Sequence, residues 1–222
     1  MPANQPIRHV VVLGHPSPGS FNHEVVQRYC TTVHENGQEA VVRDLYALDF
    51  DPCLRADRLP GHASGMSADV AHELGLLRQA QVIVFVYPIW FGMPPAIIKG
   101  YVDRVLGVAQ TPSSIRDHRP DSVLVGKSFA TFSSSATTRI WLDEQGQMES
   151  IRQAFGRHLM GMFGLRDAGH VHFGAIVEHM EPRFVAECLL EVETQARKIC
   201  SAVAAARHAA HAHEAVAAFT GD

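Results

Sequence analysis

Three loops of this sequence combine residue types that can hold a small molecule, and the first follows an apolar run near the N-terminus. It spans residues 14–22, reads Gly-His-Pro-Ser-Pro-Gly-Ser-Phe-Asn and leads into a helical pattern. Free backbone N–H groups at a strand-to-helix turn favour an anionic phosphate, and Ser17, Ser20 and Asn22 add neutral donors. Because the loop lacks a Walker lysine and the classical dinucleotide glycine spacing, it suits holding phosphate without transferring it. An ordinary capped turn with a solvent-facing His15 is the alternative.

The second loop places large apolar groups where a strand ends. It spans residues 87–95 and contains Pro88, Ile89, Trp90 and Phe91. Aromatic faces and a proline-rigidified backbone can pack against a flat ring such as isoalloxazine, and N–H groups of the same loop can bond its polar edge. The alternative is that the aromatic side chains only cap the core or fill a dimer interface.

The third loop, residues 133–138, consists of small and hydroxylated residues. The hydroxyls and amides of Ser133, Ser134 and Ser135 are expected to approach the other edge of the same ring. In an open parallel sheet, ligands lie beyond the carboxyl ends of the strands at the topological switch point. A plain solvated loop would have a similar sequence. The prediction for the third loop therefore depends on its position beside the other two loops.

Hydrophobic periodicity predicts the elements that position these loops. The β-branched run Ile7–Leu13 indicates a strand covered on both faces. Further strands are expected at residues 39–45, 82–86, 128–132 and 170–173, and helices at residues 25–35, 68–79, 95–106, 148–163 and from 182 onward. Residues 46–66 should be irregular. Five strands alternating with helices imply a right-handed, doubly wound α/β sheet.

Length and composition narrow the class of protein. The 222 residues, 46% of them hydrophobic, suffice for one sizeable core, so we expect a single domain over residues 1–222. A net charge of -4 without a basic stripe argues against nucleic acid as a partner. The most apolar stretch, Val82–Ile98, contains three prolines, which argues against membrane insertion. The Ala/His-rich tail begins at Ala204, and residues 206–222 are expected to fray.

Cysteine and histidine usage gives no sign of a metal site. The four cysteines lie far apart without a Cys-x-x-Cys pair, as expected of reduced thiols in a cytoplasmic protein. Three of the fourteen histidines, His208, His211 and His213, lie close together, yet no carboxylate or cysteine partner accompanies them. We assign no metal.

The loops resemble those of the flavodoxin-like NAD(P)H:quinone oxidoreductases of the DT-diaphorase type. The family's opening pattern of His followed by Ser-Phe-Asn appears as His15 and residues 20–22. Its aromatic Pro-x-Trp loop, running into Pro-Ala-Ile-x-Lys-Gly-x-x-x-Arg-Val, appears at residues 87–92 and 95–105. Asp44-Leu45-Tyr46 also looks like the family, and the order of elements matches from about residue 7 to residue 205.

The resemblance implies a flavodoxin-like, three-layer α/β/α sandwich with a five-stranded parallel sheet in the order 2-1-3-4-5. It also implies FAD, with FMN as an alternative, NADPH or NADH as co-substrate, and a homodimer with active sites at the interface. The flavin pyrophosphate would lie at the first loop and the flavin ring against the second and third. The implied cofactor-binding residues are His15, Ser17, Ser20, Phe21, Asn22, Pro88, Ile89, Trp90, Phe91, Ser133, Ser134 and Ser135.

The chain departs from the family at two places. Relatives present Thr-Thr-Gly-Gly where this chain has its three serines, so the hydroxyls remain and the glycines are lost. Relatives also carry a Tyr and a His that assist flavin reduction, at positions where this chain has Trp141 and Gln147. Neither side chain relays a proton as histidine does.

Our hypothesis is a ping-pong oxidoreductase that passes hydride from NAD(P)H through the flavin to a quinone or similar aromatic acceptor. We assign no side chain as catalytic acid or base, because the cofactor carries the chemistry. One alternative is a flavin-binding regulatory subunit of another protein with incidental reductase activity. The other is a flavin-free α/β enzyme that binds a different phosphorylated ligand.

Overall fold

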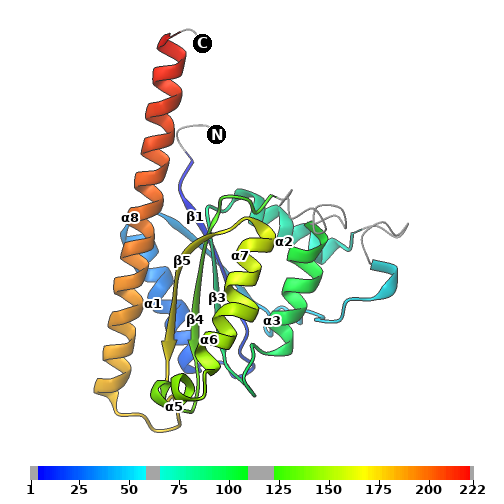
Figure 1. Cartoon of the computed structure of the whole chain (residues 1–222), viewed down its shortest axis with the longest axis vertical. Coiled ribbons are helices and arrows are strands. Elements are labelled where there is room, and N and C mark those ends of the chain that lie inside the picture. The colour runs from blue at the N-terminus through cyan, green and yellow to red at the C-terminus, as the bar shows by residue number, and fades with distance from the viewer. Residues whose placement is uncertain (1–4, 59–65, 110–122, 221–222) are drawn as a thin grey trace.

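A computed structural model describes residues 5–58, 66–109 and 123–220. Within them the strands β1 to β5 form one sheet in the order β2-β1-β3-β4-β5, and all neighbours pair in parallel (Figure 1). This arrangement confirms the expected doubly wound, flavodoxin-like sheet. The strands are β1 (Arg8–Leu13), β2 (Glu39–Asp44), β3 (Val82–Pro88), β4 (Ser128–Ser134) and β5 (Arg166–Phe173).

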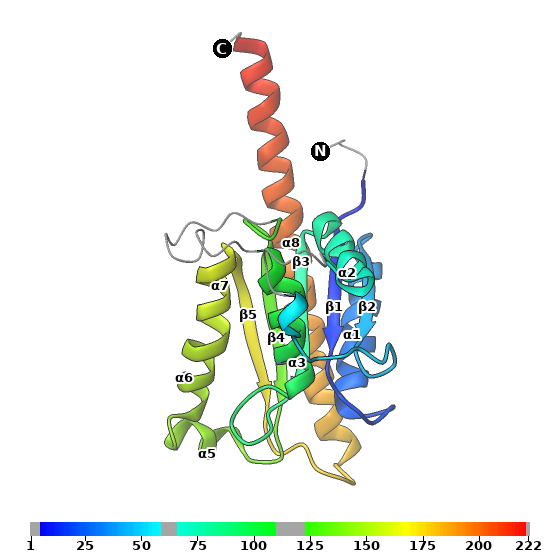
Figure 2. The ribbon, with the colours of Figure 1, turned by 90° about the vertical axis from the view of Figure 1, so that its right-hand side faces the viewer.

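Helices cover both faces of the sheet (Figures 1 and 2). On one face α1 and α8 pack together, and the remaining labelled helices supply apolar side chains to the other face. The helices of the described ranges are α1 (Phe21–Glu35), α2 (Ala68–Gln79), α3 (Ala96–Tyr101), α5 (Arg139–Glu144), α6 (Gln147–Ile151), α7 (His158–Phe163) and α8 (Pro182–Thr220). Wider π-helical turns at Val102–Leu106 and Arg152–Arg157 continue α3 and join α6 to α7, and tight 3-10 turns lie at Ala56–Arg58 and Gly107–Ala109.

The central strand β3 explains why the fold forms. All seven of its residues are buried, as its unbroken apolar sequence requires of a strand covered on both faces. Because side chains alternate across a strand, Phe85 and Tyr87 enter the core beneath α2 to α7, while Val84 and Val86 enter the core beneath α1 and α8. Each such burial stabilises the fold by roughly 1.5–3 kcal/mol.

The structure differs from the sequence-based expectation at element ends. The expected helix over residues 148–163 is divided into shorter pieces and preceded by α5. Strand β5 begins at Arg166, four residues earlier than expected, because Gly164 ends α7 in a left-handed conformation. Helix α8 continues to Thr220, past the expected start of the tail at Ala204. Alanine is the strongest helix former, so this alanine-rich segment forms a helix despite its weak apolar pattern.

Residues 46–58 are largely irregular, as expected, whereas residues 59–65 of that predicted loop lie outside the described ranges. None of the helices that the structure describes has the length and apolar character to span a membrane.

A polar network lies inside the layer between β1 and α8. His9 is fully buried, with Nδ1 2.8 Å from the Tyr29 hydroxyl and Nε2 2.7 Å from Oε1 of Gln38. Because an amide oxygen only accepts, Nε2 carries the proton and Nδ1 accepts from the tyrosine. The Gln38 amide donates in turn to the carbonyl of Cys200 in α8, at 3.0 Å. Burial lowers the pKa of His9 to about 4, so the fold contains a neutral imidazole.

We therefore expect acid to destabilise the fold between pH 6.5 and pH 4. The unfolded chain binds the His9 proton near the ordinary pKa of 6.5, whereas the folded chain binds it only near 4. The stabilisation is complete above pH 6.5 and is lost as the pH falls toward 4, at about 1 kcal/mol per pH unit for each such histidine. His170 and His172, with pKa values also near 4, add to this slope. Urea unfolding at a series of pH values measures it.

The variant His9→Gln keeps a neutral polar side chain that cannot titrate, so its slope should be shallower than that of the wild type. His34→Gln, at an exposed position of α1, is the control and should leave the slope unchanged. Equal slopes in the wild type and His9→Gln would contradict the assignment of a neutral buried His9.

Candidate functional site

The three candidate loops meet at the carboxyl ends of β1, β3 and β4. The N–H of Gly14, just after β1, donates to the carbonyl of Val86 in β3 at 3.0 Å. The N–H of Ile89, after β3, donates to the carbonyl of Ser134 at 2.6 Å. Gly14 also allows close packing of α3, since a Cβ there would collide with the side chain of Ile98. The loops therefore form one continuous rim beside the switch point between β1 and β3.

The first loop leaves the start of α1 without a side-chain cap. Ser20 occupies the N-cap position, but its hydroxyl lies 2.8 Å from Nδ1 of His23 and does not bond the helix N–H groups. The other ring nitrogen of His23, Nε2, lies 3.2 Å from the Asp44 carboxylate. Nearby, Nδ1 of His15 accepts from the N–H of Ser17 at 3.1 Å, and partial burial lowers the pKa of His15. Uncapped N–H groups of a 15-residue helix fit an anionic phosphate.

Two of the expected first-loop residues have side chains that point into the protein. The Phe21 ring is buried and packs edge-on against Phe173 of β5, with ring centroids 5.3 Å apart. Asn22 is also buried, and its Oδ1 accepts from the hydroxyl of Ser134 at 2.9 Å. At Phe21 and Asn22 a ligand at the helix start could therefore contact the backbone N–H groups but not the side chains.

The second loop is a tight turn that displays aromatic side chains. Trp90 and Met93 exchange two backbone hydrogen bonds of 3.0 and 3.1 Å, and Phe91 and Gly92 between them adopt positive φ angles of 49° and 84°. A left-handed phenylalanine costs roughly 1–3 kcal/mol, a strain typical of functional sites. The Phe91 side chain is fully exposed, whereas Pro88 and Ile89 are buried.

Trp90 joins the first two loops. Its side chain is 42% exposed, and its ring centroid lies 6.1 Å from that of His15. An aromatic surface therefore stands directly beside the uncapped start of α1. An exposed aromatic ring and uncapped helix N–H groups are therefore neighbours at this rim.

The three serines of the third loop are buried, and their hydroxyls are used within the protein. Ser134 bonds Asn22, while the hydroxyls of Ser133 and Ser135 both contact the imidazole of His172. Their side chains hold the loop in place, whereas the residues that follow Ser135 are exposed. This differs from our expectation that the hydroxyls themselves approach the ring.

The structure adds one residue to the site that sequence reasoning missed, and a contact for another that it had named. His23 follows Ser20 by three residues on α1, a spacing that could have revealed their contact. Gln147, at the start of α6, lies against the second loop, because a side chain at Gly92 would collide with its amide group. Only the fold could show that contact. Among the described residues, no three His, Cys, Asp or Glu side chains are grouped to hold a metal ion.

The fold and this rim define a flavodoxin-like α/β protein. A model of the flavodoxin-like fold family matches residues 8–196, and the chain therefore belongs to that family.

Known proteins share parts of the sequence and most of the fold. An uncharacterized NAD(P)H oxidoreductase from Haemophilus influenzae is 37% identical over 102 residues, which cover 45% of this chain and 50% of that protein. NAD(P)H dehydrogenase (quinone) 1 from Rattus norvegicus is 30% identical over 134 residues, covering 51% and 48%. The chain thus matches about half the length of these relatives. The solved NAD(P)H:quinone oxidoreductase from Methanothermobacter marburgensis shares the fold, with a TM-score of 0.75, 24% identity and coverage of 87% and 98%.

The Asn22–Ser134 contact predicts a structural role for Asn22. In Asn22→Ala the Ser134 hydroxyl would be buried without its acceptor, so the free energy of unfolding should fall by about 1–3 kcal/mol. The exposed Ser17→Ala is the control and should change it by less than about 0.5 kcal/mol. Urea unfolding compares the two, and the double variant Asn22→Ala/Ser134→Ala should recover part of the loss. Equal stability of the two single variants would contradict the prediction.

Proposed function

We propose that this protein is a flavin-dependent NAD(P)H oxidoreductase that passes hydride by a ping-pong cycle to a quinone or similar aromatic acceptor. One observation carries the proposal: the uncapped start of α1 and the aromatic turn at Trp90 lie side by side at the switch point. A phosphate next to a surface for a flat ring matches the two ends of a flavin. The names of the two relatives, both NAD(P)H-dependent, support the donor.

Different residues of the rim would bind the phosphate and the ring of the flavin. The N–H groups at the start of α1, with His15 and Ser17, would hold the phosphate, and the proposal favours FAD, with FMN as the alternative. Trp90 and Phe91 would pack against the ring and leave one face open to the donor and then the acceptor. A bound flavin supplies the hydride chemistry itself, so the protein contributes binding, orientation and electrostatics.

On the side of the rim formed by the second and third loops, few side chains could transfer a proton. Gln147 and Trp141 do not titrate, and the buried His172 stays neutral at pH 7 because burial lowers its pKa to about 4. On that side, backbone N–H groups are therefore the donors available to stabilise negative charge at the ring, as they do in oxyanion holes. This supports a role for the protein in positioning and polarisation rather than in acid–base catalysis.

Purified protein should show flavin absorption bands after reconstitution with FAD or FMN, and NADH or NADPH should bleach them under anaerobic conditions. Addition of a soluble benzoquinone should restore the bands. Bands that persist after both nicotinamides would favour a flavin-binding regulatory subunit. The absence of bands after reconstitution would overturn the flavin assignment.

The variant Trp90→Ala locates the flavin within the rim. Loss of one stacking surface should weaken flavin affinity by about tenfold, equivalent to roughly 1.4 kcal/mol. Leu190→Ala removes an exposed apolar side chain from α8, away from the rim, and should leave the affinity unchanged. Equal affinities in both variants would place the ring elsewhere.

We also propose a homodimer with active sites at the subunit interface. Support comes from large apolar side chains left exposed in the second loop and on α5, namely Trp90, Phe91, Met93, Ile140 and Trp141. Sedimentation of the full chain at micromolar concentration should give twice the monomer mass of 24.3 kDa. A monomer mass, with or without flavin, would contradict the dimer.

A further inference from the structure

A hydrogen-bonded chain of two histidines and two serines connects β5 to the third loop. Nε2 of His170 lies 2.7 Å from the hydroxyl of Ser133, which lies 2.9 Å from Nδ1 of His172. Nε2 of His172 lies 3.1 Å from the hydroxyl of Ser135, and that hydroxyl donates to the carbonyl of Thr137 at 2.8 Å. Both serines and His172 are buried.

A bulge in β5 is what brings the two histidines together. Asp167 pairs with Phe129 and His170 with Thr131, so β5 has one extra residue between these pairs. Gly169 adopts a φ of +109° there, and its N–H donates to the Asp167 carboxylate at 2.8 Å. Without the extra residue, the side chains of His170 and His172 would still lie on the same face of β5. That face would be the one on which the Val171 side chain now lies.

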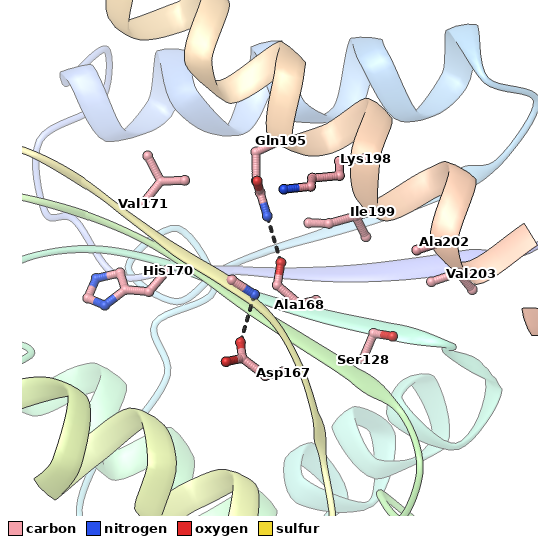
Figure 3. A pocket seen from close by; sticks show the side chains of 11 residues that line it. Ser128, Asp167, Ala168, His170, Val171, Gln195, Lys198, Ile199, Ala202 and Val203 are labelled. Carbon is pink, nitrogen blue, oxygen red and sulfur yellow. Dashed lines mark hydrogen bonds between the residues drawn. The ribbon is translucent and has the colours of Figure 1, made fainter.

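Figure 3 shows the result of the bulge. The side chains of Asp167 and His170 lie on one side of β5, and those of Val171 and Gln195 lie on the other, next to a cavity of about 490 Å³. The Gln195 amide secures the bulge by donating to the carbonyl of Ala168 at 2.6 Å. The histidines are thereby directed to the face on which Ser133 and Ser135 emerge from the sheet.

Counting donors fixes the direction of every hydrogen bond in the chain. The only proton of the Ser135 hydroxyl goes to the Thr137 carbonyl, so His172 must donate from Nε2. Its Nδ1 then accepts from Ser133, and Ser133 in turn accepts from Nε2 of His170. Two neutral Nε2–H imidazoles satisfy all these groups. Burial lowers the pKa of both to about 4, with Arg139 and Arg152 acting in the same direction and Asp143 and Asp167 in the opposite one.

The far end of this chain is the backbone of the exposed residues that follow Ser135. The carbonyls of Ser135 and Thr137 accept from the N–H groups of Ile176 and Ala175, each at 2.9 Å, so they are turned inward. Among the described residues, none accepts a hydrogen bond from the N–H of Ala136 or Thr137. The N–H groups of Ala136 and Thr137 therefore remain available as donors. The rest of the loop backbone is held by its contacts with the segment after β5 and, through Ser135, with His172.

We propose that His172 is a positioning residue for flavin binding: it fixes Ser135, and through Ser135 the outward N–H groups of the third loop. The inference rests on the proposed flavin function. Preorganised N–H groups stabilise negative charge on a bound ring without reorganising when the charge develops. The hydrogen bond from His172 to Ser135 thus supplies the rigidity of the third loop.

Three substitutions at one position separate this role from simple packing. The amide nitrogen of Gln reaches about as far as Nε2 and can still donate to Ser135, whereas the shorter Asn reaches only as far as Nδ1. We expect His172→Gln to bind FAD or FMN within about threefold of the wild type, and His172→Asn and His172→Leu to bind about tenfold more weakly, the effect of one hydrogen bond. Fluorescence titration with each flavin measures the affinities, and the bound flavin spectrum should shift only in the weaker variants.

His170→Leu is the matched control, because His170 contacts Ser133, the loop residue that still lies within β4, and not Ser135. It should bind flavin as the wild type does. If His172→Leu does not fold, Ser135→Ala replaces it, with the same expected loss. Equal affinity in His172→Leu, or in Ser135→Ala, and the wild type would overturn the inference and leave the flavin function intact, whereas a wild type that binds neither flavin would overturn the function.

The tautomers can be tested without any flavin. Nitrogen-15 NMR of the flavin-free protein at pH 7 should show His170 and His172 neutral with the proton on Nε2. A proton on Nδ1 of His172 would reverse the chain: Ser135 would then donate to Nε2 of His172 and would lose its hydrogen bond to the Thr137 carbonyl, which connects the chain to the loop backbone. That result would overturn the inference independently of flavin binding.

Discussion

The adjacency of β1 and β3 is the constraint on which the site depends. The hydrogen bond from the Gly14 N–H to the Val86 carbonyl fastens the ends of the two strands together. Their outgoing loops then leave to opposite faces of the sheet, toward α1 and α3. The uncapped start of α1 and the aromatic turn can therefore be neighbours although more than sixty residues separate them in sequence. Glycine is required at position 14, because α3 packs too closely for a side chain.

The alternation of side chains at the end of β4 gives Ser133, Ser134 and the next residue, Ser135, different roles. Ser134 faces α1 and bonds Asn22, so it links the third loop to the first. Ser133 and Ser135 face the opposite side and bond His172. A run of three chemically identical residues thus ties one loop to two neighbours, because successive positions on a strand point in opposite directions. The loop is held from both faces of the sheet.

Much of the sheet could be predicted from sequence, and the contacts of the site could not. The apolar run of β3 and the helical periodicity of α2 are local signals, and their bounds were predicted closely. The inward direction of Phe21 and Asn22 depends on Phe173 and Ser134, residues more than a hundred positions away. A serine-rich loop has the same composition whether its hydroxyls face a ligand or a buried histidine.

The β5 bulge is the least predictable feature and explains why the strand was predicted too short. Gly169 interrupts the alternation of apolar residues, so the pattern before it reads as loop. The same glycine turns His170 toward Ser133, and burial there keeps both histidines neutral. Neutral imidazoles can each donate and accept once, which is what an ordered chain between two serines requires. The low pKa values of this pair are thus a consequence of the packing that orders the loop, and at the third loop they leave the backbone N–H groups, instead of titrating side chains, to set the electrostatics.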